Sequence, residues 1–203
     1  QGVGFRPFMF RLAKSLSVCG FVQNNAEGVY AEIEGDDAAC DRFIAALRHH
    51  PPVLSQIMSL EVQKKPLRGE KDFMIAASGS GVRNALISPD IGICGACKAD
   101  ISDPSNRRYR YALTNCTDCG PRFSILCDIP YDRSNTTMAD FMQCPDCLHE
   151  YGDPYDRRFH AQPNACPVCG PKLSFYKKGK LLEGDPIAFF HDCIKEGGIV
   201  AVK

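Results

Sequence analysis

Apolar positions in the first 80 residues switch from helical spacing to strand spacing. Pro7 stands where the first turn of a helix tolerates proline. Apolar residues at helical intervals extend this pattern to about Val18: Phe8, Phe10, Leu12, Ala13 and Leu16. Residues 20–24 and 29–33 then read as two strands joined by a turn. The start of the chain therefore predicts a helix followed by a β-hairpin.

The same pattern repeats in the next stretch of the chain. A helix is predicted over residues 38–49, with three apolar side chains on one face: Phe43, Ile44 and Leu47. Pro51 and Pro52 end it. Strands are predicted near 55–63 and 73–77. The order helix, strand, strand, helix, strand, strand is that of an α+β unit.

A second patterned region follows residue 172. Residues 172–176 and 180–182 predict a hairpin, and residues 185–195 predict an amphipathic helix. The apolar run 199–203 predicts a strand. The chain begins on Gln rather than Met and stops within this strand, so we expect it to be part of a longer protein.

Between these regions, four Cys-x-x-Cys pairs dominate the sequence. One motif occurs twice, fifty residues apart, with eighteen residues between the two pairs of each copy. Four thiolates are the ligand set of a structural zinc ion, and they leave no position open for catalysis. We predict two structural Zn²⁺ sites, formed by Cys94, Cys97, Cys116 and Cys119 and by Cys144, Cys147, Cys166 and Cys169. Interleaved ligation is the alternative, and the self-similar repeat favours the sequential arrangement.

The two copies also match outside their cysteines. Residues 103–109 correspond to 153–159, and residues 120–124 correspond to 170–174. Each copy is too small to build a useful apolar core, so we expect metal to supply its folding energy.

Other uses of these cysteines fit less well. Disulfides would suit a secreted protein, but eight of the twelve cysteines lie in Cys-x-x-Cys pairs, which favours a reducing cytoplasm. No thioredoxin-like βαβ pattern supports a redox role. His149 and His160 are alternative ligands that four cysteines per copy make unnecessary. The remaining cysteines, Cys19, Cys40, Cys127 and Cys193, are interpreted as buried small apolar residues.

Composition limits the partners. The formal net charge of the 203-residue chain is zero, so no global field attracts nucleic acid or an anionic membrane. Arginines near the cysteine pairs suggest nucleic-acid binding, but aspartates interleave with them and favour internal ion pairs. No apolar run reaches transmembrane length, and no signal peptide opens the chain. We therefore expect a cytoplasmic protein that binds neither nucleic acid nor membrane.

A glycine loop precedes the first predicted helix. Glycines at positions 2 and 4 let successive backbone N–H groups turn toward one side, and a helix N-terminus favours an anion there. Arg6 follows at once, and its planar guanidinium suits a phosphate. The alternative is an ordinary turn with a solvated arginine.

Two stretches carry a resemblance to a known family. Residues 1–6, Gln-Gly-Val-Gly-Phe-Arg, resemble the first acylphosphatase signature, and residues 20–24 with Gly28 and Val29 resemble the second. The resemblance implies a ferredoxin-like βαββαβ sandwich, here without the first strand, which would precede Gln1. It further implies that Gln1, Gly2, Val3, Gly4, Phe5 and Arg6 bind phosphate, and that Arg6 and Asn24 are catalytic. In this family the asparagine orients the attacking water.

The combination of this unit with the doubled cysteine motif resembles the carbamoyltransferases of [NiFe]-hydrogenase maturation. The resemblance includes residues 157–167, Arg-Arg-Phe-His-Ala-Gln-Pro-Asn-Ala-Cys-Pro, and the tail 197–203. It implies that carbamoyl phosphate is cleaved, that carbamate is adenylated with ATP and Mg²⁺ in domains beyond this chain, and that the carbamoyl group passes to a thiol of the partner HypE. The implied domains are an acylphosphatase-like domain (1–80), a tandem zinc-finger region (90–172) and the start of a YrdC-like domain (173–203).

Two functional hypotheses follow. The first is an enzyme fragment that binds and hydrolyses carbamoyl phosphate or another acyl phosphate. The second is a noncatalytic zinc scaffold that docks neighbouring domains or a maturation partner.

Overall fold

The protein divides into two compact units in a computed structural model that describes residues 2–25, 28–52, 54–78 and 86–202. Residues 1–170 form the first unit and residues 171–203 form the second. The first unit holds a three-stranded sheet with two helices and the cysteine repeat. The second unit holds a β-hairpin and one helix.

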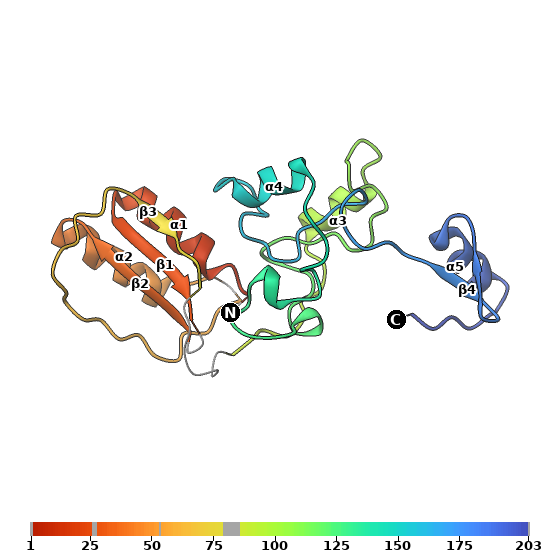
Figure 1. The fold of residues 1–203 in the computed structure, drawn as a ribbon, viewed down its shortest axis with the longest axis horizontal. Coiled ribbons are helices and arrows are strands. Elements are labelled where there is room, and N and C mark those ends of the chain that lie inside the picture. Colours follow the sequence, from red (N-terminus) through yellow and green to blue (C-terminus); the bar gives the residue numbers. More distant parts are fainter. Residues whose placement is uncertain (1, 26–27, 53, 79–85, 203) are drawn as a thin grey trace. The chain divides into compact units, whose positions relative to one another are not determined.

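Three strands form the sheet of the first unit (Figure 1). They are β1 (Cys19–Asn24), β2 (Val29–Glu34) and β3 (Phe73–Ile75), in the order β2-β1-β3. β1 and β2 are antiparallel, with Asn24 opposite Val29, as the predicted hairpin requires. β3 runs parallel to β1, with Phe73 opposite Gly20. The central strand β1 therefore ends at Asn24.

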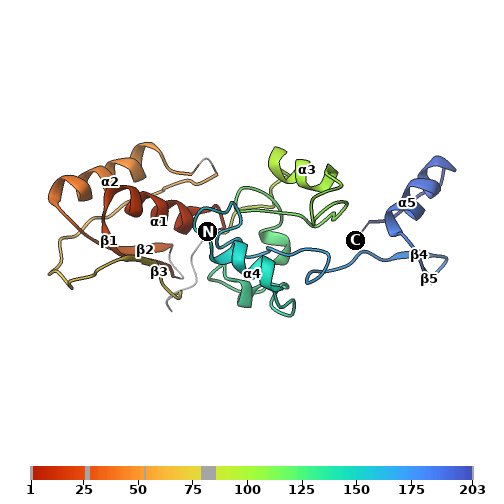
Figure 2. The ribbon, with the colours of Figure 1, turned by 90° about the horizontal axis from the view of Figure 1, so that it is seen from above.

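Helices α1 (Phe5–Leu16) and α2 (Asp37–His49) cover one face of this sheet (Figure 2). α1 ends because Ser17 adopts a left-handed φ of 55°. α2 begins where the Asp36 carboxylate accepts a hydrogen bond from the Ala39 amide at 2.7 Å. Both helices were predicted from apolar spacing, and both are confirmed.

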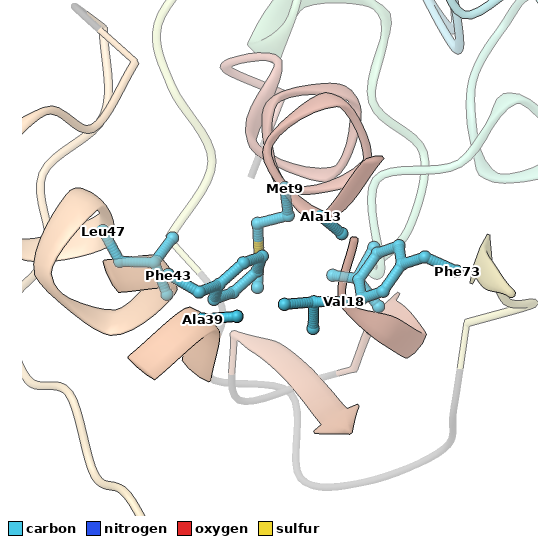
Figure 3. Packing of buried hydrophobic residues seen from close by; sticks show 8 residues of the cluster. Met9, Ala13, Val18, Ala39, Phe43, Leu47 and Phe73 are labelled. Atoms are coloured by element: carbon cyan, nitrogen blue, oxygen red, sulfur yellow. The ribbon is translucent and has the colours of Figure 1, made fainter. Parts of the chain in front are cut away.

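The apolar core lies between the two helices and the sheet (Figure 3). Its buried members come from all of these elements: Met9, Ala13, Val18, Val22, Ala39, Phe43, Leu47 and Phe73. Burying one side chain of the size of leucine or phenylalanine contributes roughly 1.5–3 kcal/mol. This part of the chain therefore has a core that does not depend on metal.

The strand predicted near 55–63 is not formed by the described residues of that segment. Leu60 packs against the core, but Met58 and Val62 on either side of it are exposed. Apolar alternation favours a strand only when a neighbouring strand offers backbone partners, and here the segment meets none in the described sheet. β3 is also shorter than the predicted 73–77, although the Ala76 amide still donates to the Val22 carbonyl at 2.9 Å.

The two cysteine motifs fold alike. Each begins with a helix capped by its first cysteine: α3 (Gly95–Ser102) after Cys94, and α4 (Pro145–Gly152) after Cys144. Arg110 and His160, which occupy the same place in the repeat, both adopt left-handed conformations with φ of 58° and 54°. Two short 3₁₀ helices, Phe123–Ile125 and Arg133–Asn135, lie between the motifs. The sequence repeat is thus a repeat of backbone conformation.

The second unit contains the predicted hairpin and helix. Strands β4 (Phe175–Lys177) and β5 (Lys180–Leu182) are joined by a two-residue turn, and helix α5 (Pro186–Lys195) follows. The predicted strand at the chain end is not formed over residues 199–202, where Ile199 is 98% exposed. No helix in the described parts of the chain is long and apolar enough to cross a membrane.

Candidate active site and metal centres

The glycine loop leads directly into α1. Gly2 and Gly4 have φ of 79° and 71°, a left-handed region that glycine enters without a Cβ clash. Gly4 caps the helix, and its carbonyl accepts a hydrogen bond from the Phe8 amide at 3.0 Å. A loop of this shape before a helix suits an anion. Gln1, predicted in the same loop, lies outside the described residues.

Arg6 and Asn24 lie side by side in the interior, 8% and 3% exposed. The hydrogen-bond donors around Asn24 place its side-chain oxygen, rather than its NH₂ group, toward Arg6. This oxygen accepts hydrogen bonds from Nε and Nη2 of Arg6, both at 3.2 Å. Packing of α1 against β1 brings the two residues together, because Arg6 opens the helix and Asn24 ends the strand. A cation and a polar amide are thereby held next to the glycine loop.

The Arg6 guanidinium also reaches the segment between the two cysteine motifs. Its Nη1 lies 2.8 Å from Oδ1 of Asp132, and its Nη2 donates to the Tyr131 carbonyl at 3.3 Å. The other carboxylate oxygen of Asp132 accepts from the Ser78 hydroxyl. The charge of Arg6 is therefore balanced by a carboxylate 126 positions away in the sequence.

Arg122 ties the glycine loop to the first cysteine motif. It is 2% exposed, and its Nε donates to the Gly2 carbonyl. Its Nη atoms donate to carbonyls around the second cysteine pair: Cys116 at 3.2 Å, Thr117 at 2.8 Å, Cys119 at 3.0 Å and Pro121 at 2.8 Å. A Cβ at position 2 would lie 3.0 Å from Cδ of Arg122, so Arg122 would have to shift by a few tenths of an ångström. The backbone around one cysteine cluster thus positions the loop.

A cavity of about 630 Å³ opens beside Arg6. One wall of the cavity is formed by the end of β3 and the residues after it: Ile75, Ala76, Ala77 and Ser78. The other wall comes from the cysteine region: Pro130, Asp132, Arg133, Ser134, Asn135, Tyr151, His160 and Gln162. Asp132 is the acidic member of this lining. The sequence motifs indicate Arg6 here and give no indication of Asp132.

His160 lines the same cavity and is not a member of either four-cysteine group. Its ring packs against Tyr151 and Phe159, with centroids 4.9 and 4.6 Å apart. Burial and, to a smaller extent, the nearby charge of Arg6 outweigh the opposing effect of Asp132 and lower the pKa of His160 to about 4. The imidazole is therefore neutral near pH 7.

The eight predicted ligands form two groups of four. The sulfur atoms of Cys94, Cys97, Cys116 and Cys119 lie within 4.8 Å of one another, and so do those of Cys144, Cys147, Cys166 and Cys169. The grouping follows the sequential arrangement. Within the groups, the sulfur atoms of Cys94 and Cys116 lie 3.7 Å apart, and those of Cys166 and Cys169 lie 3.8 Å apart. Tetrahedral zinc with Zn–S bonds of about 2.3 Å requires sulfurs about 3.8 Å apart, so the four-sulfur sets fit this ion.

Each cluster receives arginines from the other copy of the motif. Arg107 and Arg108 donate to the Cys147 sulfur at 3.3 and 3.5 Å and pair with Glu150. In the reciprocal direction, Arg157 donates to the Cys97 sulfur at 2.8 Å. Arg157 and Arg158 both pair with Asp100, the counterpart of Glu150.

The arginines of each motif also donate to backbone carbonyls of the other motif. Nε of Arg108 donates to the Ala165 carbonyl at 3.0 Å, and Nε of Arg158 donates to the Asn115 carbonyl at 3.1 Å. Burial raises the pKa of Glu150, but hydrogen bonds from Arg108 and Arg107 outweigh it and bring the pKa to about 2. The arginines are thus internal ion-pair partners, as the interleaved charges indicated.

Two interpretations of single residues need correction. Cys127, expected to be buried, is exposed, and Cys19, Cys40 and Cys193 are only partly buried. The segment between the two motifs does contribute to a small buried cluster through Ile125, Met138 and Phe141, but Cys127 is not part of it. His149 is not a loop residue: it lies on α4 and is absent from both four-sulfur groups.

Family models match the two parts of the chain separately. The acylphosphatase model matches residues 1–75, and the HypF finger model matches residues 93–126 and 143–176. An acylphosphatase of Thermotoga maritima is 41% identical over 76 residues, which are 37% of this chain and 83% of that protein. The fold and the cysteine clusters thus define an acylphosphatase domain followed by HypF-type fingers.

Relatives that share both parts complete the assignment. The carbamoyltransferases HypF of Synechocystis sp. and Rhodobacter capsulatus are each 48% identical over the whole chain, which covers 27% of either relative. A crystal structure of full-length HypF in a phosphate- and nucleotide-bound form matches 97% of the chain with a TM-score of 0.89 and 47% identity, and the chain covers 26% of it. The first 75 residues thus belong to the acylphosphatase family. The whole chain is similar to the HypF carbamoyltransferases, and it spans about a quarter of the length of these relatives.

Proposed function

We propose that this chain binds and hydrolyses carbamoyl phosphate at the glycine loop. The observation that carries this proposal is the buried pair Arg6 and Asn24, in hydrogen-bond contact beside a left-handed glycine loop at a helix N-terminus. In this assignment the phosphate-binding residues are 1–6 and the catalytic residues are Arg6 and Asn24. Similarity to the HypF carbamoyltransferases and the acylphosphatase match favour an acyl phosphate as substrate.

Hydrolysis of an acyl phosphate requires positive charge near the phosphoryl group and a correctly placed water molecule. The phosphoryl oxygens accept hydrogen bonds from the loop amides and from Arg6, which stabilises the charge of the transition state. The Asn24 side chain orients the water that attacks phosphorus, and carbamate departs as a good leaving group. No general acid or base is required for this step, and the neutral His160 nearby is not assigned one.

We further propose that the two four-cysteine clusters bind structural Zn²⁺. Four thiolates per ion close the coordination sphere, so the metals stabilise the fold and take no part in the reaction. Arg122 and Asp132 connect the first motif and the following segment to the glycine loop. This connection also supports a scaffold function for the zinc region, which holds the loop in place.

The remaining steps belong to a longer protein. We propose domain limits of 1–80 for the acylphosphatase-like domain, 90–172 for the tandem zinc-finger region and 173–203 for the start of a YrdC-like domain. In such a protein, carbamate is adenylated with ATP and Mg²⁺ beyond this chain, and the carbamoyl group is transferred to a thiol of a HypE-like partner for cyanide-ligand synthesis in [NiFe]-hydrogenase maturation.

Phosphate release from carbamoyl phosphate tests the hydrolytic assignment. Arg6→Ala removes the guanidinium that faces Asn24, and we expect kcat/KM to fall about 10²- to 10³-fold, the usual effect of losing one preorganised transition-state donor. Arg11→Ala is the matched control, because Arg11 is an exposed arginine on the same helix. Circular dichroism and zinc content verify that both variants fold.

The outcomes separate clearly. Equal activity in the wild-type chain and in folded Arg6→Ala would show that the reaction does not use this site. An inactive wild-type chain would contradict the hydrolytic function, while a zinc content of two ions per chain would still support the scaffold.

A further inference from the structure

The cavity beside Arg6 is closed on one side by the cysteine region. Arg6 is the residue through which the phosphoryl group is held, so the rest of the substrate extends into this cavity. The walls around it include Asp132, Arg133, Tyr151, His160 and Gln162, none of which belongs to the acylphosphatase part of the chain. The zinc region is therefore placed to contact the acyl end of the substrate.

Most of the lining residues have polar side chains, but many of their polar atoms already have partners. The Gln162 oxygen accepts from the Arg133 amide at 2.7 Å and from the Tyr151 hydroxyl at 3.2 Å. The Asn135 amide donates to the Pro130 carbonyl at 2.8 Å. These groups fix one another and leave little capacity for a ligand.

Asp132 differs because a carboxylate offers about four acceptor sites. One oxygen lies 2.8 Å from Arg6 Nη1, and the other accepts from Ser78, so each keeps a lone pair for a further donor. The carboxylate also shares the guanidinium that would hold the phosphoryl group. In carbamoyl phosphate only three bonds separate phosphorus from the amino nitrogen. One molecule of this length spans from Arg6 to the neighbourhood of Asp132.

We propose that Asp132 selects the acyl group of the substrate by accepting a hydrogen bond from the carbamoyl NH₂. This inference rests on the proposed hydrolysis of carbamoyl phosphate. Acetyl phosphate places a methyl group at the same position, and a methyl group donates no hydrogen bond to the carboxylate. The negative charge of Asp132 then faces the phosphoryl group without a donor between them. A site built around a substrate N–H discriminates against an analogue that lacks it. The zinc region thus selects the acyl group of the substrate, and the glycine loop with Arg6 binds its phosphoryl group.

The test compares two substrates rather than one. We expect Asp132→Ala to lower the ratio of kcat/KM for carbamoyl phosphate to kcat/KM for acetyl phosphate about 10- to 100-fold, as the loss of one hydrogen bond to a charged group implies. Hydrolysis of acetyl phosphate should fall less than hydrolysis of carbamoyl phosphate. Asp132→Asn keeps an acceptor oxygen without the charge, so its ratio should lie between those of wild type and Asp132→Ala. Asp140→Ala, which removes an exposed acidic residue of the same inter-motif segment, should leave the ratio unchanged.

Different failures have different meanings. If the wild-type chain hydrolyses neither substrate, the proposed function is wrong. If a folded Asp132 variant loses both activities equally and keeps the wild-type ratio, Asp132 only positions Arg6 and the specificity inference is overturned. Zinc content and circular dichroism identify folded variants, and Asp132→Asn serves as the test if Asp132→Ala does not fold.

Discussion

At the scale of single residues, the candidate site joins groups that the sequence indicated with groups that it did not. Arg6 and Asn24 were predicted from two short motifs, because a resemblance to acylphosphatases carries over position by position. Asp132 was missed, because it acts through a contact with Arg6 that spans more than a hundred positions, and His160 was considered only as a metal ligand. A short sequence motif cannot show which distant loop contacts a helix N-terminus in the folded protein.

His160 provides a prediction on pH. Its pKa in the folded protein is about 4, and burial is the main cause, so the folded state binds this proton less readily than the unfolded chain, where a histidine titrates near 6.5. Stability is thus greatest above about pH 6.5 and is lost as the pH falls toward 4. We expect the His160 ring signal in NMR spectra to titrate near pH 4.

The His160→Gln variant supplies the matching measurement. It removes the proton-binding group, so its free energy of unfolding should fall less than that of wild type between pH 6.5 and 4.5, by a difference of about 2 kcal/mol. A ring signal that titrates between pH 6 and 7 would contradict the buried, neutral state of this histidine.

At the scale of elements, the cysteine spacing predicted both four-sulfur groups but not how the two copies contact each other. The repeat Arg107-Arg108 and Arg157-Arg158 was visible in the sequence, and the structure shows that each pair serves the opposite cluster. Spacing within one copy carries no information on such an exchange. The unformed strand near 55–63 has the same cause: its apolar alternation was correct, but a strand also requires a partner that pattern alone does not supply.

The exchanged arginines predict that each metal site depends on the other copy. In Arg157→Ala, the thiolate of Cys97 loses a charged donor at 2.8 Å, although Arg157 belongs to the second motif. Loss of an outer partner of a metal ligand typically costs 10- to 100-fold in affinity. We expect zinc to leave the Cys94 cluster first when a chromophoric chelator is added. Alkylation of the released cysteines, mapped by mass spectrometry, identifies the emptied site.

The repeat provides its own control. Arg107→Ala should show the opposite order, with the Cys144 cluster alkylated first, because Arg107 donates to Cys147. If each variant instead loses zinc from its own motif, or if both variants release the two ions in the wild-type order, the arginine contacts do not stabilise the metal sites.

At the scale of the whole first unit, two kinds of stabilisation are combined. The sheet and its helices have an apolar core of eight buried residues that includes Met9 and Phe73. The two buried clusters of the cysteine region have three members each, and one of them consists of cysteines alone. The composition and the repeat predicted this division. The sequence did not show that the glycine loop lies where the two parts meet. Arg122 contacts this loop from the cysteine region, and Asp132 contacts Arg6 beside it.

This division predicts a local effect of zinc removal. Structural zinc in small domains contributes on the order of 10 kcal/mol of folding free energy, so chelation should unfold the cysteine region and release the contacts of Arg122 and Asp132. The Phe8 amide, which donates to the Gly4 carbonyl, should then exchange its hydrogen much faster, and hydrolysis of carbamoyl phosphate should fall with it. The Val22 amide, in the central strand β1 over the separate core, should keep its protection. Hydrogen exchange with mass spectrometry measures both regions in one experiment. Persistent protection at Phe8 after complete zinc loss would show that the loop does not need the zinc region, and simultaneous loss of protection at Val22 would show that the two parts fold as one.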